Sequence, residues 1–190
     1  RTAIWLAVGD AMDMHKCVWE IEKMRKLIRL CLLAPLVFFG LARAAAEAPK
    51  LEDRLQISDQ IARYSQLWDR KDAEGFSELF TDDGVLEWHF ADASDQPPSL
   101  TGRDNILQYA RKAHAGRLAG RQSRHHFSGL VFERLTDETA FTEHMFMVTH
   151  VLPDEPPIVR STGIYQIEWR KTDRGWLMSH RKLFVDRRAD

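Results

Sequence analysis

The sequence has 190 residues, of which 44% are hydrophobic and 29% charged, and its formal net charge is −1. This balance is ordinary for a globular protein and leaves room for one domain with a tail. It shows no basic excess, so we expect no nucleic-acid partner. It also matches none of the common phosphate-loop, CxxC or HExxH motifs.

The N-terminal stretch has the composition of a targeting segment. Residues 24–29 form a short basic stretch. Residues 30–42 are uncharged and apolar, and three alanines follow at 44–46. This pattern is typical of a secretory signal peptide. We therefore assign 1–23 to an upstream segment outside the fold, 24–46 to the signal peptide and 47–190 to the domain. The expected location is secreted or periplasmic, without membrane attachment after cleavage; an uncleaved anchor is the alternative.

Helices are expected first in the domain. Apolar residues recur at helical spacing between Leu51 and Arg70 and form one stripe: Ile57, Ile61, Tyr64 and Trp68. Asp69 follows this stripe in the last turn, where the negative end of the helix dipole disfavours a carboxylate. It is therefore either a solvated charge or a residue held by a buried partner. Asp72 is a suitable N-cap for a short second helix, and a third helix is expected to about Gly116.

Strands are expected in the rest of the domain. Residues 85–90 alternate, with Trp88 on the apolar side, and further strand patterns cover 124–132, 140–151, 158–170 and 176–186. Helices followed by mostly antiparallel strands indicate the α+β class. We expect a cone-like α+β barrel in which N-terminal helices pack on a curved, mostly antiparallel sheet and enclose a cavity.

The hairpin of 124–132 and 140–151 carries the candidate chemistry. If its loop is the three residues 137–139, then Thr136 faces Ala140 and His126 falls opposite His150. Directly opposed residues point to the same side of a sheet. Two imidazoles side by side suit proton transfer, because imidazole titrates near neutrality. A loop one residue shorter would place His126 and His150 on opposite faces.

The order of elements resembles the nuclear transport factor 2-like superfamily, in particular its SnoaL-like branch. The marks are the helix 61–72, the run Leu79-Phe80-Thr81-Asp82-Asp83-Gly84, and the helix start Thr101-Gly102-Arg103. The resemblance covers about Asp53 to Arg187. It implies the fold more than the reaction, because one fold hosts many functions.

Within that branch the site is most similar to that of scytalone dehydratase. This family uses an aspartate at the end of its first helix and two cavity histidines. Asp69, His126 (in His126-Phe127-Ser128-Gly129) and His150 (in the run from His144) match them. Trp68 and Trp88 stand where that family has two tyrosines, and Gln166 falls near its cavity asparagine. Because the tyrosines are replaced, scytalone itself is not the expected substrate.

The resemblance implies a cofactor-independent dehydratase or isomerase acting on a small, aromatic or polyketide-like carbonyl compound. Asp69, His126 and His150 would be catalytic, and Tyr64, Trp68, Trp88 and Gln166 would bind substrate. The alternative is a non-catalytic ligand-binding or oligomerisation module. Two histidines and a carboxylate can also ligate iron, but we expect no metal. The outer sheet face would form a homodimer or homotrimer, with His125 pointing outward.

Overall fold

The computed structural model describes residues 22–23 and 50–188, and the side chains of the domain up to Asp186. The segments assigned to the upstream region and the signal peptide lie outside the described residues, apart from 22–23. Both assignments therefore stay predictions. Within the part that is described, no helix is both long enough and apolar enough to cross a membrane.

The first helix of the domain has the predicted apolar stripe. It covers residues 50–69, here called the 50–69 helix, and its four stripe residues Ile57, Ile61, Tyr64 and Trp68 are all buried. Helix α2 (Ala73–Glu78) follows, and the Asp72 side chain caps it by accepting the Gly75 N–H at 2.8 Å. Helix α3 (Arg103–Ala115) buries Ile106, Ala110 and Ala113. The sequence prediction of three helices is confirmed.

The strands form one six-stranded sheet in the order β2-β1-β6-β5-β4-β3. All neighbours are antiparallel except β1 and β6, which run parallel. Strand β1 begins at Phe80, five residues before the prediction, and the short β2 was not predicted. The bounds are β1 (Phe80–Phe90), β2 (Leu100–Thr101), β3 (Gln122–Leu135), β4 (Thr139–Val151), β5 (Ile158–Thr172) and β6 (Gly175–Arg188).

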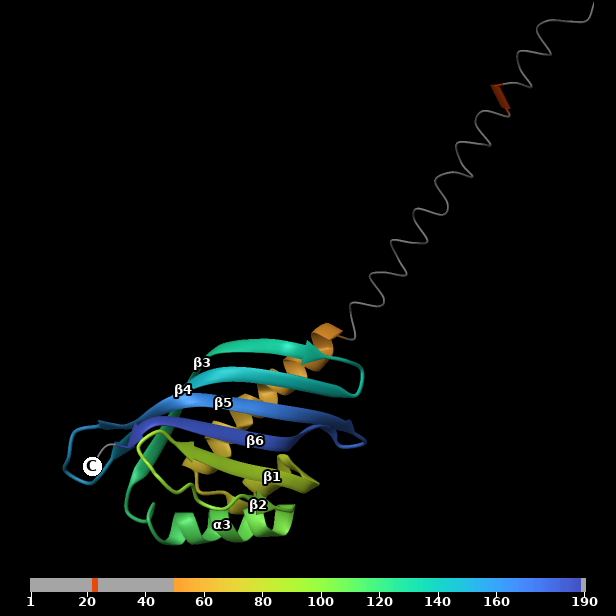
Figure 1. Ribbon diagram of the computed structural model, residues 1–190. Coiled ribbons are helices and arrows are strands. Elements are labelled where there is room, and N and C mark those ends of the chain that lie inside the picture. Colours follow the sequence, from red (N-terminus) through yellow and green to blue (C-terminus); the bar gives the residue numbers. More distant parts are fainter. Residues whose placement is uncertain (1–21, 24–49, 189–190) are drawn as a thin grey trace, which may run out of the picture. The chain divides into compact units, whose positions relative to one another are not determined.

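The helices cover one face of the curved sheet, here called the inner face, and the predicted α+β class is confirmed. The 50–69 helix, orange in Figure 1, passes behind β3 to β6, and α3 lies below β1 and β2. Asp53 anchors the start of this helix, because its buried carboxylate accepts hydrogen bonds from Trp176 at 2.8 Å and Lys171 at 2.7 Å. These bonds fix the start of the helix against β5 and β6.

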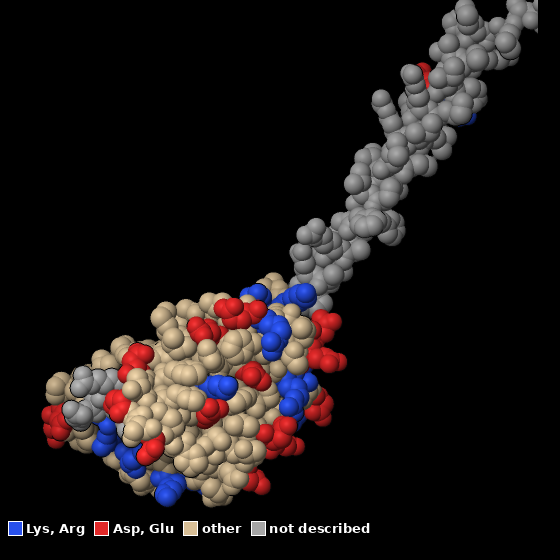
Figure 2. Space-filling model, in the orientation of Figure 1, with Lys and Arg blue, Asp and Glu red and all other residues tan. Residues whose placement is uncertain are grey.

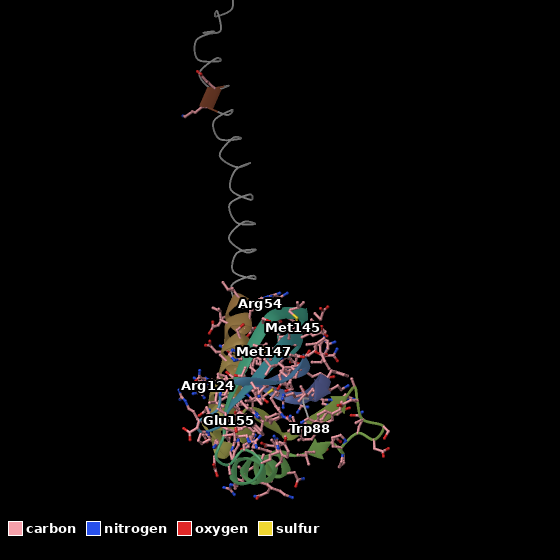
Figure 3. The ribbon with its side chains drawn as sticks, turned by 90° about the vertical axis from the view of Figure 1, so that its left-hand side faces the viewer. Arg54, Trp88, Arg124, Met145, Met147 and Glu155 are labelled. Carbon is pink, nitrogen blue, oxygen red and sulfur yellow. The ribbon has the colours of Figure 1, made fainter. Side chains whose placement is uncertain are left out.

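No helix of the described domain covers the opposite, outer face of the sheet. Figure 2 looks at this face and shows uncharged residues over much of β3 to β6, with scattered charges between them. In the nearly edge-on view of Figure 3, Met145 lies on the side away from the 50–69 helix. Val131, Met145 and Val159 are each about half exposed, at 49%, 54% and 52%.

The predicted register of the β3–β4 hairpin is wrong. Leu135 faces Ala140, so the loop is one residue longer than assumed, and the register then shifts at two bulges, between Phe132 and Arg134 and between Ser128 and Val131. A bulge adds a residue to one strand and moves every later pair. As a result His126 faces Met147, while His150 faces Ser123. His126 and His150 are therefore on opposite faces of the sheet.

Candidate functional site

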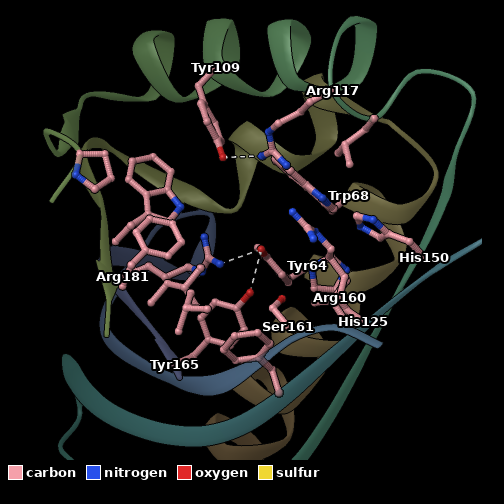
Figure 4. A pocket seen from close by; sticks show the side chains of 18 residues that line it. Tyr64, Trp68, Tyr109, Arg117, His125, His150, Arg160, Ser161, Tyr165 and Arg181 are labelled. Carbon is pink, nitrogen blue, oxygen red and sulfur yellow. Dashed lines mark hydrogen bonds between the residues drawn. The ribbon is translucent and has the colours of Figure 1, made fainter. Parts of the chain in front are cut away.

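A cavity of about 500 Å³ lies between the helices and the inner face of the sheet. Its wall is mainly aromatic and aliphatic, and a small number of polar side chains point into it, as Figure 4 shows. This combination is typical of sites for small organic molecules. The wall residues that matter most below are Tyr64, Trp68, Trp88, His125, His150 and Arg181.

Asp69 and His125 form a buried pair at one wall of the cavity. Asp69 Oδ1 lies 2.7 Å from His125 Nδ1, and the two side chains are only 8% and 7% exposed. Asp69 also accepts the His125 backbone N–H at 2.8 Å and the Ser123 hydroxyl at 2.8 Å. Burial alone would raise the pKa of the Asp69 carboxyl, but the hydrogen bonds from His125 and Ser123 outweigh it and hold this pKa below its ordinary value.

This pairing fixes the chemistry of the His125 ring. An ionised carboxylate at Nδ1 keeps the proton on that nitrogen. Nε2 is then the basic nitrogen, and no described residue is hydrogen-bonded to it, while the ring lines the cavity. The same carboxylate stabilises the imidazolium that forms when Nε2 takes a proton. His125 therefore has the arrangement of a general base directed at a cavity ligand.

His150 lines the same cavity in a different electrostatic state. Burial lowers the pKa of His150 to about 4, helped by the positive charges of Arg121 and Arg160 nearby. Its Nδ1 is buried without a hydrogen-bond partner among the described residues. At neutral pH His150 is an uncharged imidazole, which can hydrogen-bond a ligand through one N–H and one lone pair.

Two tyrosines and an arginine meet at another part of the wall. Arg181 Nη2 donates to Tyr64 Oη at 2.7 Å, and the Tyr64 and Tyr165 hydroxyl oxygens are 3.4 Å apart, as the dashed lines in Figure 4 show. The Arg181 guanidinium lies 4.5 Å and 4.2 Å from the Tyr64 and Tyr165 ring centroids. All three residues are buried, and burial raises the pKa of Tyr64 well above its ordinary value, so its hydroxyl stays protonated.

The structure brings together only part of the predicted site. Asp69, His150, Tyr64, Trp68 and Trp88 lie at or directly behind the cavity wall. His126 does not: it is exposed on the outer face, with Nε2 3.3 Å from Thr149 Oγ1. The expected contact between Asp69 and His126 is made by His125 instead.

Gln166 was also predicted in the cavity and lies elsewhere. It pairs with Glu143 across β4 and β5, and its amide donates to the Glu143 carboxylate at 2.9 Å. Its neighbour Tyr165 lines the cavity instead. Both errors are shifts of one position, which exchange the two faces of a strand.

Sequence reasoning also missed Tyr165 and Arg181. Tyr165 had a usable signal, because it alternates with Ile167 and Trp169 on the buried side of β5. Arg181 had none, since an arginine in a strand is ordinarily solvent-exposed. The cavity also contains Arg117, which donates to Tyr109 Oη at 2.8 Å.

The described residues contain no group of three or more histidine, cysteine or acidic side chains placed to ligate one metal ion. Asp69 uses both carboxylate oxygens for His125 and Ser123. The arrangement is thus that of a hydrogen-bonded acid–base pair.

A family model described as SnoaL-like domain matches residues 49–182. The chain belongs to the SnoaL-like family. The match spans the 50–69 helix and all the strands except the end of β6, so the resemblance predicted from the sequence is confirmed. Among curated proteins, none matches this chain.

Solved structures give the same fold. A protein of unknown function from Mycobacterium tuberculosis has 26% identity and a TM-score of 0.61, over 73% of this chain and 74% of its own. A nuclear transport factor 2-like protein with a cystatin-like fold from Novosphingobium aromaticivorans has 25% identity and a TM-score of 0.63, over 74% and 86%. A protein provisionally named scytalone dehydratase, also from N. aromaticivorans, has 21% identity and a TM-score of 0.62, over 76% and 91%. At this identity the last likeness shows the fold alone.

Proposed function

We propose that this SnoaL-like protein is a cofactor-independent lyase or isomerase that transfers a proton next to the carbonyl group of a small, ring-containing compound. The observation that carries the proposal is the buried Asp69–His125 pair at the wall of a largely apolar cavity. Correct orientation and a fixed tautomer are what a general base requires. The aromatic walls formed by Trp68 and Trp88 favour a ligand that contains a ring.

The step proceeds as follows. His125 Nε2 takes the proton from the carbon next to the carbonyl group, and the C–H electron pair moves into an enolate. In a lyase this pair then forms the new C=C bond, while the C–O bond breaks and the departing hydroxide takes the proton from the His125 imidazolium to leave as water. In an isomerase the proton returns to a different carbon. Asp69 stays ionised throughout and stabilises the imidazolium.

His150 would assist without carrying the positive charge. Because its pKa lies at about 4, it is not an imidazolium at neutral pH and is a poor source of a proton. Its N–H can instead hold the leaving hydroxyl or the carbonyl oxygen. Proton uptake and return are therefore both assigned to His125.

The test compares two adjacent histidines. Exchange of the proton next to the carbonyl group is followed by NMR in D2O over a panel of cyclic and aromatic ketones, which requires no prior substrate. We expect His125→Gln to lower the exchange rate about 100-fold or more, since general bases contribute 10²–10⁴-fold. The matched variant His126→Gln should exchange at the wild-type rate. Equal rates in the two variants would contradict the proposal.

A non-catalytic ligand-binding role is the second candidate. It is favoured by the uncharged His150 and by the cavity itself, which suits binding without reaction. Ligand binding by calorimetry together with no proton exchange in the wild-type protein would support it. Both candidate functions therefore predict ligand binding, but only the catalytic one predicts proton exchange.

We also propose that the protein forms homo-oligomers through the outer face and is exported to the periplasm or secreted. The half-exposed apolar residues Val131, Met145 and Val159 support the first proposal. The basic and apolar pattern of residues 24–46 supports the second. N-terminal sequencing of protein recovered from the periplasm or medium tests export, and cleavage near Ala46 is expected.

A further inference from the structure

Arg181 is a buried cation for which the described residues provide no carboxylate. The residue is only 3% exposed, and its guanidinium donates to Tyr64 Oη and also interacts with the Tyr165 hydroxyl. Other buried charges in the domain are compensated: Asp53 pairs with Lys171, and Asp69 with His125. An isolated buried charge costs several kcal/mol, so it is ordinarily paired.

The surroundings of Arg181 hold it in a fixed direction. The hydrogen bond to Tyr64 and the rings of Tyr64 and Tyr165 orient the guanidinium from one side. A guanidinium has five N–H donors. Arg181 lines the cavity, and Figure 4 shows its head group directed toward the centre. Donors therefore remain available to a ligand.

The rest of the cavity wall adds positive charge and no negative charge. Arg117 and Arg160 also line it, and among the described residues no aspartate or glutamate does. The Asp69 carboxylate lies behind His125 and is engaged by it. The environment therefore favours an anion over a neutral ligand of the same shape.

We propose that Arg181, oriented by Tyr64 and Tyr165, binds an anionic oxygen of the ligand, as a carboxylate of the bound compound or as the enolate oxygen formed in the reaction. A guanidinium suits such an oxygen because its planar N–H groups donate in pairs. The ligand class is thus a ring-containing organic acid or a carbonyl compound that enolises. This inference rests on the proposed function only for the enolate form, because a carboxylate binds without any reaction.

Two matched probe pairs test the inference by titration calorimetry. 2-Naphthoate and 2-naphthamide have the same ring system and differ in charge, so they report on a carboxylate. 4-Nitrophenolate and 4-nitroanisole report in the same way on an enolate-like oxygen. We expect the wild-type protein to bind at least one anion 10-fold or more tightly than its neutral match.

Arg181→Met should abolish this preference and bring the affinity ratio close to one. Arg181→Gln, which keeps a donor for Tyr64 Oη, should act in the same way and serves if the methionine variant does not fold. The control Arg174→Met removes an exposed arginine that pairs with Glu78 outside the cavity, and it should leave the ratio unchanged. His125→Gln should keep the ratio while losing proton exchange, which separates the two proposals.

Three results would overturn the inference. One is a wild-type ratio near one for both probe pairs. Another is a wild-type ratio retained by a folded Arg181 variant. The third is loss of the preference in Arg160→Met together with its retention in Arg181→Met, which would move the anion site to the other wall.

Discussion

His125 and His126 are adjacent on β3 and yet belong to two different environments. His125 lies on the inner face, where its side chain is 7% exposed and bonded to Asp69. His126 lies on the outer face, exposed, with a long hydrogen bond of 3.3 Å to Thr149. The two residues have the same chemical type and nearly the same sequence position. Only the side of the sheet on which the imidazole lies decides whether it reaches the cavity and Asp69.

Two carboxylates show the same contrast. Asp69 on the inner side is buried and accepts three hydrogen bonds, from Ser123 and from two groups of His125. Glu87 also meets two imidazoles, those of His89 at 2.5 Å and His180 at 2.8 Å, but its side chain is 26% exposed. Water screens the outer cluster, so the two carboxylates should differ in their contribution to stability.

The largest effect expected from a single substitution separates these two carboxylates. Asp69→Ala leaves buried donors of His125 and Ser123 without an acceptor, and we expect it to lower the free energy of unfolding by about 3 kcal/mol or more. Glu87→Ala should lower it by less than about 1 kcal/mol. Urea denaturation of both variants measures the difference. Similar losses would show that burial does not distinguish the two faces.

A second effect comes from buried histidines on the inner face. The pKa of both His144 and His150 is lowered to about 4, in each case mainly by burial and then by nearby arginines. The unfolded chain binds protons near pH 6.5, so between pH 6.5 and 4 it carries more protons than the folded protein. The contribution of the two histidines to the free energy of unfolding is therefore fully present above pH 6.5. It is lost as the pH decreases toward 4, by about 3 kcal/mol for each histidine.

Denaturation at intervals between pH 7 and 4 measures this loss. His144→Leu removes one of the two groups and should reduce the loss by about half, while the outer-face variant His126→Leu should leave it unchanged. Equal pH dependence in wild type and His144→Leu would show that His144 is not the group that titrates.

A smaller effect separates two threonines of β4. Thr142 is fully buried and accepts the Trp169 Nε1–H at 2.8 Å, whereas Thr149 lies on the outer face near His126. Thr142→Val leaves a buried indole N–H unpaired and should lower the free energy of unfolding by about 1–2 kcal/mol. Thr149→Val should change it by less than about 0.5 kcal/mol. Thermal or urea denaturation checks both values, and an equal cost would contradict the assignment of faces.

The smallest effect on the stability of the monomer is expected at Met145, where a substitution should change the oligomeric state instead. Met145→Lys places a charge among exposed apolar residues and should change the free energy of unfolding of the monomer by less than about 0.5 kcal/mol. In a homo-oligomer built on the outer face it should cause dissociation, because a buried unpaired charge is costly. Light scattering coupled to size-exclusion chromatography distinguishes the two states. A wild-type monomer would contradict the oligomer proposal.

The sequence by itself determined the three helices, the five long strands and their order. The apolar stripe from Ile57 to Trp68 predicted the 50–69 helix, and the alternating patterns predicted the sheet, because helical and strand periods depend only on local geometry. For Asp69 at the helix end the sequence left two alternatives, a solvated charge or a residue held by a buried partner, and the structure supplies the partner. The cavity-lining roles of Tyr64, Trp68 and Trp88 were implied by the resemblance to scytalone dehydratase, and the structure places all three at the wall.

Only the tertiary structure decided which side chains meet. A hairpin loop one residue longer than assumed, together with two bulges in β3, one of them at Gly129 with φ of 66°, shifted the pairing by an odd number of positions and replaced His126 by His125. A glycine inside a strand pattern signals such a bulge, but the number of residues it displaces depends on the partner strand. Arg181 and Tyr64 are 117 positions apart, and no local pattern encodes a contact of that separation. The faces of a sheet alternate at every residue, so a shift of one position in register is enough to exchange the cavity and the solvent.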